Sequence, residues 1–298
     1  MRLLAGCRTL VASCARPLAE RAAKSYVAGD TLDDALDVAD QLEARGLGIS
    51  LGYWDGPDDT PRGVADEYLA GIEALAGQPH GYISMKVPSL DYSRELVAEI
   101  AQCAMQRKVR LHFDALAPDS ADRSRALGDE LLDRGATLSY TLPGRWARSV
   151  ADAAWAADRG ITVRVVKGQW PDPSDPGCDL RAGFLRTIDA LAGRARHVAV
   201  ASHDPSLVAE AIGRLQAAGT SCELELLHGL PMRASLKLAD RLALGVHVYV
   251  PYGKAYLPYA LSRARANPRI LWWLVRDLVT SWRRGMPVER EPSTLTAH

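Results

Sequence analysis

Aromatic hydroxyls and a guanidinium gather near the end of the chain, within residues 249–268. Tyr259 and Arg263 lie four residues apart, so on a helix that begins near Pro258 both side chains project from one face. A guanidinium matches both oxygens of a carboxylate, and a tyrosine ring packs on an aliphatic ring while offering its hydroxyl. With Tyr249 on a preceding strand, these residues predict a pocket for a small acid. The alternative is a capped surface helix with an ordinary arginine.

The composition excludes several classes of partner. The 298-residue chain carries 36 basic and 36 acidic residues and has no basic block, so nucleic acid is not expected to bind. No uninterrupted apolar run approaches the roughly 18 to 20 residues that span a bilayer. The five cysteines are scattered, with neither a C-x-x-C pair nor the spacing of a metal site. We therefore expect no metal and reduced thiols in a cytoplasmic protein, and a peripheral contact with the inner membrane stays open.

Short β-branched or apolar runs recur eight times, each followed by a polar loop and then by a segment with helical spacing. The predicted strands are residues 48–53, 81–87, 109–114, 136–142, 161–167, 197–203, 221–227 and 246–250. Helices are predicted at residues 31–45, 94–106, 120–134, 147–159 and 206–218, with a last helix at residues 268–282. This α/β pattern favours a closed (β/α)8 TIM-like barrel. An open doubly wound sheet would show fewer strands or a Gly-rich nucleotide turn.

We expect one domain over residues 1–298, because no linker rich in Pro, Gly or Ser divides the chain. It would consist of an N-terminal helical segment over residues 1–46, a barrel over about 47–284 and a flexible tail over 285–298. Helical residues before the first strand would close the bottom or the flank of the barrel. The Arg-containing residues 1–24 superficially suit a transit peptide, but an ordinary amphipathic helix is the better interpretation.

Polar residues fall where the predicted strands end, which is where the active sites of such barrels form. They are Lys86, Asp114, Arg164, Lys167, His203, Glu225 and Tyr249. Charged residues inside apolar strands are costly to bury unpaired, so we expect a shared polar site. Taken singly, Lys86 and Asp114 could form a structural ion pair, and His203 could be a core or capping histidine. Glu223 and Glu225 alternate with leucines, so both face the same way.

Motifs in these strands resemble those of the proline dehydrogenase family, flavin enzymes built on a distorted barrel. The resemblance runs from about Tyr26 to about Leu278. The matching pieces are Ile83-Ser84-Met85-Lys86, Phe113-Asp114, Val163-Arg164-Val165-Val166-Lys167-Gly168, Ala201-Ser202-His203-Asp204 and Tyr249-Val250-Pro251-Tyr252-Gly253, continued by Tyr259 and Arg263. The Arg-x-x-Lys-Gly piece and the last segment together carry the resemblance.

The resemblance implies oxidation of L-proline to 1-pyrroline-5-carboxylate, with hydride passing to N5 of a noncovalent FAD. It implies a catalytic pair in which Arg164 lies near the flavin N5 and Asp114 orients the surrounding cations. The implied cofactor contacts are Ala115, Ser139, Arg164, Lys167, Gly168, Gln169, Ser202 and His203. The implied substrate contacts are Lys86, Tyr249, Tyr259, Ser262 and Arg263. A quinone is the implied electron acceptor.

The chain also departs from the family pattern. Ser262 stands where the family has the first of two arginines that clamp the proline carboxylate. Losing a charged hydrogen-bond partner removes about 1.5–3 kcal/mol, roughly ten- to a hundredfold in affinity. Ala266 replaces a glutamate, and Ser139 and Glu225 each stand in place of a glutamine. These departures leave three alternatives: weak proline turnover, a different substrate such as a proline derivative or another cyclic secondary amine, or an inactive relative.

Two further classes of function keep the barrel without the flavin. Lys86 or Lys167 could form a Schiff base with a carbonyl substrate, as lysines in desolvated barrel mouths do. The chain could instead be a noncatalytic binding subunit with Trp272 and Trp273 at an interface, although adjacent tryptophans on an apolar helix also suit core packing.

Overall fold

Strands and helices alternate through the described part of the protein, residues 27–78 and 80–253 of the computed structural model. The strands are β1 (Gly48–Tyr53), β2 (Gly81–Met85), β3 (Arg110–Phe113), β4 (Leu138–Pro143), β5 (Thr162–Val166), β6 (Val198–Ala201), β7 (Cys222–Leu227) and β8 (Val246–Tyr252). The α-helices are α2 (Leu32–Glu43), α3 (Pro61–Ala74), α4 (Arg94–Arg107), α5 (Ala121–Asp133), α6 (Ser149–Asp158), α7 (Leu180–Leu191), α8 (Pro205–Ala217) and α9 (Arg233–Arg241). Two 3-10 helices, η1 (Val87–Leu90) and η2 (Pro118–Ser120), follow β2 and β3.

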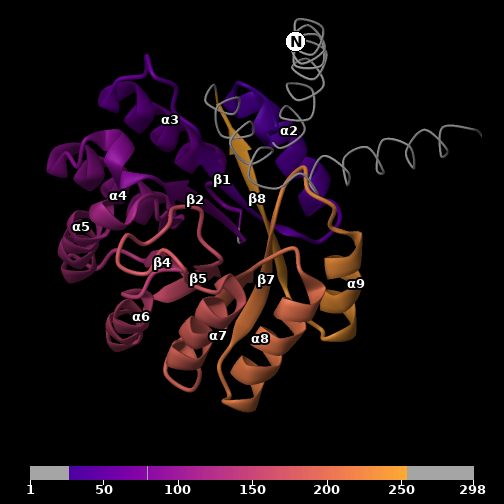
Figure 1. Ribbon diagram of the computed structural model, residues 1–298. Coiled ribbons are helices and arrows are strands. Elements are labelled where there is room, and N and C mark those ends of the chain that lie inside the picture. Colours follow the sequence, from indigo (N-terminus) through magenta and orange to yellow (C-terminus); the bar gives the residue numbers. More distant parts are fainter. Residues whose placement is uncertain (1–26, 79, 254–298) are drawn as a thin grey trace, which may run out of the picture. The chain divides into compact units, whose positions relative to one another are not determined.

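The strands form one closed, all-parallel barrel in chain order. Each strand pairs with its predecessor, and β8 also pairs with β1 from Gly48 opposite His247 to Tyr53 opposite Tyr252. Figure 1 shows this junction, with the orange-yellow β8 beside the indigo β1. The predicted (β/α)8 barrel is therefore confirmed.

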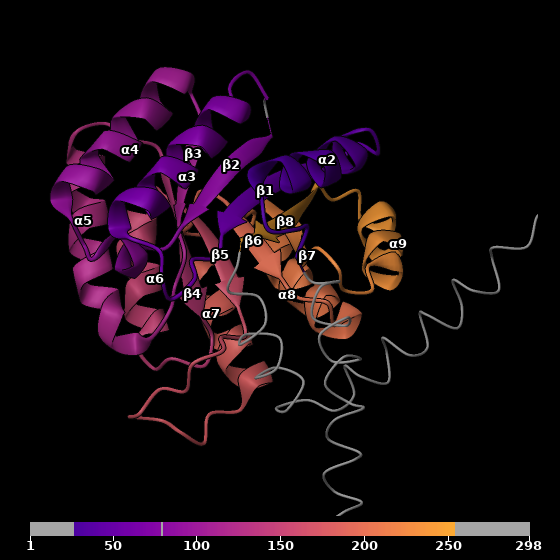
Figure 2. The ribbon, with the colours of Figure 1, turned by 90° about the horizontal axis from the view of Figure 1, so that it is seen from above.

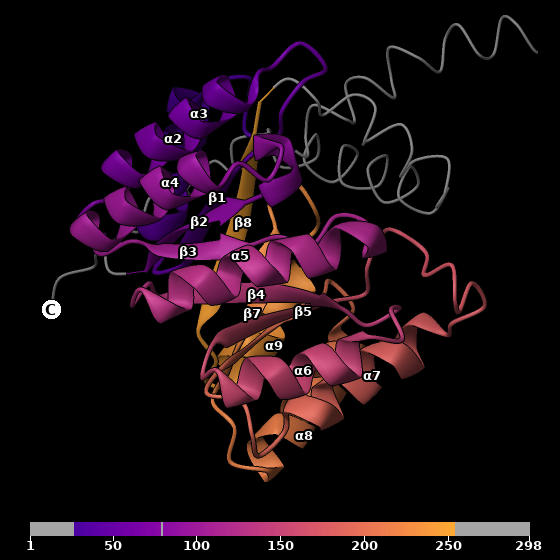
Figure 3. The ribbon, with the colours of Figure 1, turned by 90° about the vertical axis from the view of Figure 1, so that its left-hand side faces the viewer.

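Helix α2, which precedes the first strand, packs on the outside of the barrel against β8 and β1. Its start is fixed by a capping box, in which the hydroxyl of Thr31 accepts a hydrogen bond from the backbone N–H of Asp34 and the carboxylate of Asp34 accepts one from the N–H of Thr31. Figure 2 shows α2 beside β1 and β8, and Figure 3 shows α5 and α6 outside the strands. The helix predicted at residues 31–45 thus covers the flank of the barrel.

The bounds of β1 agree with the prediction, whereas several other strands are shorter at their carboxyl ends than predicted. β2, β3, β5 and β6 end before Lys86, Asp114, Lys167 and Ser202, because the chain leaves the ladder at the mouth of the barrel. β8 instead runs past the predicted end at residue 250, since its pairing with β1 continues to Tyr252.

The two faces of the strands differ in chemistry. Outward-facing side chains such as Ile49, Leu51, Ile83 and Phe113 are almost inaccessible to solvent and form a core with the surrounding helices. The alternate positions carry polar side chains, and hydrogen bonds between non-adjacent strands place them inside the barrel: Ser50, Tyr82, Ser84, Arg164 and Glu225. Barrel interiors are usually filled by branched apolar residues. This one is held together by hydrogen bonds and ion pairs.

Other sequence-based expectations are tested only within the described residues. There, none of the helices combines the length and the apolar character that crossing a bilayer requires. Cys103, Cys178 and Cys222 are free thiols, in agreement with the prediction. Cys7, Cys14 and the helix expected after Pro268 lie outside the described residues.

Two glycines of β1 make room for rings of β8 inside the barrel. A Cβ atom at Gly52 would overlap the hydroxyl of Tyr249, and one at Gly48 would overlap the imidazole of His247. Glycine in a strand often marks such a close approach. The two rings can therefore occupy the interior only because β1 has no side chain at these positions.

Substituting Gly52 by alanine should displace the Tyr249 ring and destabilise the protein by about 1–3 kcal/mol, the usual cost of overpacking. The control is Gly213→Ala in α8, where a Cβ atom would meet nothing within 4 Å. That change should stabilise the protein by about 0.5–1 kcal/mol, since alanine is the better helix former. Urea denaturation of both variants measures the difference, and a loss of equal size in both would contradict the role of crowding at Gly52.

Candidate active site

A buried arginine lies at the centre of the polar interior. Arg164, on β5, forms ion pairs of 2.9 Å with both Asp114 and Glu225. Its Nε–H donates to the hydroxyl of Thr141 (3.0 Å), and Nη2 donates to the hydroxyl of Ser84 (3.2 Å). Side chains from β2, β4 and β7 and from the residue after β3 therefore hold the guanidinium that β5 carries.

The charge of Arg164 is fixed by its neighbours. Burial by itself lowers the pKa of the guanidinium, but the charges of Glu225 and Asp114 together raise it by more, so the pKa lies well above its usual value. Glu225 is in turn only 2% exposed and accepts hydrogen bonds from the hydroxyls of Tyr82 (2.8 Å) and Ser50 (3.4 Å). The site is thus a permanently cationic group held between two carboxylates.

Lys86 follows β2 directly and is buried near Trp54. Its ammonium donates to the backbone carbonyl of Tyr53 and lies 5.8 Å from the centre of the Trp54 ring. Burial lowers the pKa of Lys86 to about 8, against the opposing effect of Asp114 and Asp55. The structural ion pair considered between Lys86 and Asp114 is not formed, because Asp114 pairs with Arg164 instead.

Tyr249, on β8, connects these two cations. Its hydroxyl accepts a hydrogen bond of 2.9 Å from the indole N–H of Trp54, and the guanidinium carbon of Arg164 lies 5.4 Å from the centre of its ring. Burial and the charge of Asp114 raise the pKa of Tyr249 well above its usual value, so the hydroxyl stays protonated at neutral pH. Arg164, Lys86, Tyr249 and Asp114 are therefore brought together as the sequence predicted.

Ser139 lies deeper than predicted. Ser139 is the fourth residue of the strand predicted at 136–142, but β4 begins at Leu138, so Ser139 is the second residue of the strand. Its hydroxyl lies 2.8 Å from Nδ1 of His112, whose Nε2 lies 2.6 Å from the hydroxyl of Thr141. Thr141, two residues further along β4, is the side chain that contacts Arg164.

The rim of the barrel carries several of the predicted cofactor contacts. Lys167 follows β5, is 40% exposed in its side chain and lies 3.6 Å from the carboxylate of Asp204. Gly168 has a positive φ of 90°, which favours glycine, and the carbonyl of Gln169 accepts a hydrogen bond from Arg145. Ala115 lies directly after Asp114 and is partly buried.

The loop after β6 carries the other two predicted cofactor contacts. The hydroxyl of Ser202 accepts a hydrogen bond from the N–H of Asp204. In His203, Nε2 accepts from the N–H of Leu227 (2.8 Å) and Nδ1 lies 3.2 Å from the carbonyl of Pro231. His203 thereby ties the loop after β6 to the end of β7, which agrees with the structural alternative. Tyr259, Ser262 and Arg263 lie outside the described residues.

Sequence reasoning missed several participants in the network. Tyr82 and Ser84 alternate with Lys86 on β2, and Thr141 alternates with Ser139, so the period of two residues could have indicated that they face inward. Trp54 gave no comparable signal, because it follows β1 in a loop and its role depends on a contact with β8.

The ion pairs of Arg164 predict a strong coupling with Glu225. Arg164→Met should destabilise the protein by about 3–5 kcal/mol, because Glu225 is left buried without a cation. The double variant Arg164→Met/Glu225→Gln should recover much of that loss, since no unpaired charge remains. Urea denaturation of the single and double variants measures the coupling. A double variant no more stable than Arg164→Met would rule out the unpaired carboxylate as the cause.

Known proteins resemble this chain in sequence and in fold. None of the protein-family models matches it. Proline dehydrogenase 1 of Bacillus subtilis strain 168 is 25% identical over 265 residues, which cover 83% of this chain and 87% of that protein. Proline dehydrogenase of Deinococcus radiodurans is 23% identical over 296 residues, covering 91% and 94%.

Solved structures share the barrel. Proline utilization A (PutA) of Bdellovibrio bacteriovorus, inactivated by N-propargylglycine, superposes with a TM-score of 0.69 at 16% identity over 82% of this chain. PutA of Corynebacterium freiburgense gives 0.68 at 19% identity over 84%. The chain spans about a third of the length of these PutA proteins, 32% and 31%. The chain is therefore similar in sequence, over most of its length, to curated proline dehydrogenases, and it shares the barrel fold of the PutA structures.

Proposed function

We propose that the protein is a flavin-dependent dehydrogenase that oxidises L-proline to 1-pyrroline-5-carboxylate in proline catabolism. The reaction removes a hydride from the ring carbon beside nitrogen and a proton from the nitrogen as the C=N bond forms. The observation that carries the proposal is the buried Arg164, paired with Asp114 and Glu225 beside the Tyr249 ring, in a barrel homologous to proline dehydrogenases. Among the described residues, no other buried arginine is held by two carboxylates inside the barrel.

The donor set suits FAD, the cofactor implied for this family. When bound, FAD would supply the redox chemistry by accepting the hydride. Arg164 presents a fixed positive charge that would stabilise negative charge on a reduced isoalloxazine ring. The side chain of Lys167 is 40% exposed at the rim, where its ammonium would reach a phosphate, and Gly168 allows the chain to turn closely there. Gln169, Ala115 and the Ser202–His203 loop would complete the cofactor site.

Lys86 and Tyr249 suit the substrate. The ammonium would attract the proline carboxylate, and the protonated tyrosine would pack on the pyrrolidine ring. By resemblance, Tyr259, Ser262 and Arg263 complete this pocket. Ser262 replaces one of the two arginines that clamp the carboxylate in the family. We therefore expect this protein to bind proline more weakly than a protein with both arginines. A proline derivative with a masked carboxylate is the alternative substrate.

One observation favours a second function. Lys86 is buried and its pKa is lowered to about 8, so a fraction of its amine is neutral near neutral pH, as a Schiff-base lysine requires. A lyase of this kind would need no flavin. It predicts that borohydride, added with a carbonyl substrate, attaches the substrate covalently to Lys86.

We further propose a quinone as the electron acceptor and a cytoplasmic enzyme that touches the inner membrane only peripherally. The support is the family resemblance, together with the absence of a membrane-spanning helix from the residues that the structure describes.

The first test is an absorbance spectrum of the purified protein, with FAD added if it is colourless, followed by anaerobic additions of L-proline, D-proline, 4-hydroxyproline and proline amide. Bleaching of the flavin band by L-proline would support the proposed reaction, and bleaching by the amide alone would assign the masked substrate. A protein that retains no flavin would overturn the proposal. Borohydride trapping then separates the lyase from a noncatalytic barrel.

The charge of Lys86 predicts a pH dependence. The ammonium is positive below about pH 8 and neutral above it, so kcat/KM for proline should fall as the pH rises through about 8. Lys86→Met should lower kcat/KM about ten- to a hundredfold at pH 7 and flatten this limb of the profile. Lys237→Met, at an exposed position of α9, should keep the limb. If Lys86→Met keeps it as well, another group titrates there.

A further inference from the structure

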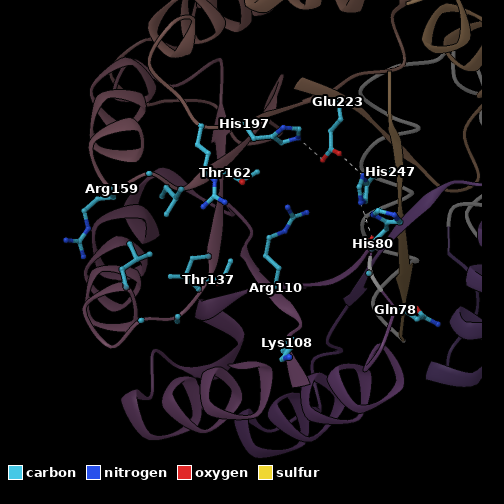
Figure 4. Close-up of a pocket in the computed structure, with 18 of the residues that line it drawn as sticks. Gln78, His80, Lys108, Arg110, Thr137, Arg159, Thr162, His197, Glu223 and His247 are labelled. Atoms are coloured by element: carbon cyan, nitrogen blue, oxygen red, sulfur yellow. Dashed lines mark hydrogen bonds and ion pairs between the residues drawn. The ribbon is translucent and has the colours of Figure 1, made fainter. Parts of the chain in front are cut away.

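A second polar basin lies at the opposite end of the barrel, where the strands begin. It has a volume of about 820 Å³ and is lined by the amino-terminal residues of several strands, including Gly81, Arg110, Leu138 and Thr162. Figure 4 shows this basin with Arg110 between Thr162 and His247. The Arg164 site is at the carboxyl ends of the strands, so the basin forms no part of the proposed proline site.

The basin is rich in cations that are not neutralised by the protein. Within residues 27–78 and 80–253, no carboxylate lies within ion-pair distance of Lys108, Arg110 or Arg196. Arg159 also lines the basin, but its guanidinium is taken up by Asp129 and Asp133. These three cations come from different elements of the barrel; Lys108 and Arg196 are exposed to solvent, and Arg110 is partly buried.

Two carboxylates line the basin, and each has a basic partner: Asp158 lies 3.4 Å from Arg194, and Glu223 lies between two histidines. Glu223 lies 2.9 Å from Nδ1 of His247 and 3.4 Å from Nε2 of His197. Nε2 of His247 lies 3.0 Å from the carbonyl oxygen of His80; burial lowers the pKa of this imidazole, but Glu223 raises it by more, so the net shift is upward. Lys108, Arg110 and Arg196 are thus three lining cations without a carboxylate partner among the described residues, whereas both lining carboxylates have basic partners.

Arg110 is the group best placed to hold a ligand. Its guanidinium stacks on the Tyr82 ring, with the guanidinium carbon 4.2 Å from the ring centre, and this contact fixes the plane of the guanidinium. Its Nε–H is buried without a hydrogen-bond partner among the described residues. A buried donor without an acceptor is destabilising, and an oxyanion in the basin would supply the missing acceptor.

We propose that this basin binds a small, multiply charged oxyanion, a phosphate compound or a polycarboxylate. A fixed guanidinium fork pairs with two oxygens of such a group, and the neighbouring Lys108 and Arg196 balance its further charge. A single chloride would use neither the fork nor the volume. The site does not rest on the proposed proline oxidation, because none of the residues that line the basin contacts Arg164; Tyr82, beneath Arg110, is the residue that also contacts Glu225.

Isothermal titration of the purified protein with pyrophosphate, citrate and chloride at low ionic strength tests the proposal. Either oxyanion should bind far more tightly than chloride, and whichever binds more tightly identifies the phosphate or the polycarboxylate as the ligand class. Arg110→Met should weaken that binding about ten- to a hundredfold, the effect of losing a charged hydrogen-bond partner. Arg196→Gln serves as the second variant if Arg110→Met does not fold.

The matched control is Arg123→Met. Arg123 stacks on Tyr92 at 3.7 Å, much as Arg110 stacks on Tyr82, but it lies at the start of α5 and does not line the basin. The control should bind the oxyanion as the unmodified protein does. Three outcomes would overturn the proposal. They are an equal loss of binding in the basin variant and in Arg123→Met, oxyanion binding no tighter than that of chloride, and no measurable binding of either oxyanion at millimolar concentration.

Discussion

The ion pairs of Arg164 with Asp114 and Glu225 are the interaction on which the rest of the interior depends. A guanidinium that is 5% exposed can be charged inside a barrel only if the protein supplies its counter-ions and hydrogen-bond acceptors. The serine, threonine and tyrosine hydroxyls around it meet that need. They occupy inward positions where branched apolar side chains normally pack, so the side chains of the polar site also fill the interior of the barrel.

This arrangement continues along the barrel axis. Near the strand starts Glu223 pairs with His247, further along Glu225 pairs with Arg164, and at the mouth Asp114 pairs with the same arginine. Each carboxylate is matched by a cation from another strand. The polar groups are therefore distributed so that the two ends of the barrel present different surfaces: a paired network with a nearby lysine at the carboxyl end, and a basin with excess positive charge at the other.

Much of the fold follows from local sequence, but less of the site does. The bounds of β1 agreed with the prediction because a short apolar run is bounded by turn residues, and the Thr31–Asp34 capping box marks the start of α2. Arg164 and Glu225 could be recognised as charges inside apolar strands. Their pairing could not, since 61 residues separate them and only closure of the barrel brings them together. The same limit applies to Trp54 and Tyr249, which are 195 residues apart.

The closure of β8 onto β1 also constrains how the chain can fold during synthesis. The first strand stays an unpaired edge until the last strand has been made, and Arg164 lacks one of its carboxylates until β7 follows. Contacts this distant in sequence form slowly, and open strand edges can pair with other chains meanwhile. A nascent chain that stalls before β8 therefore leaves one edge of β1 open to pairing with other chains.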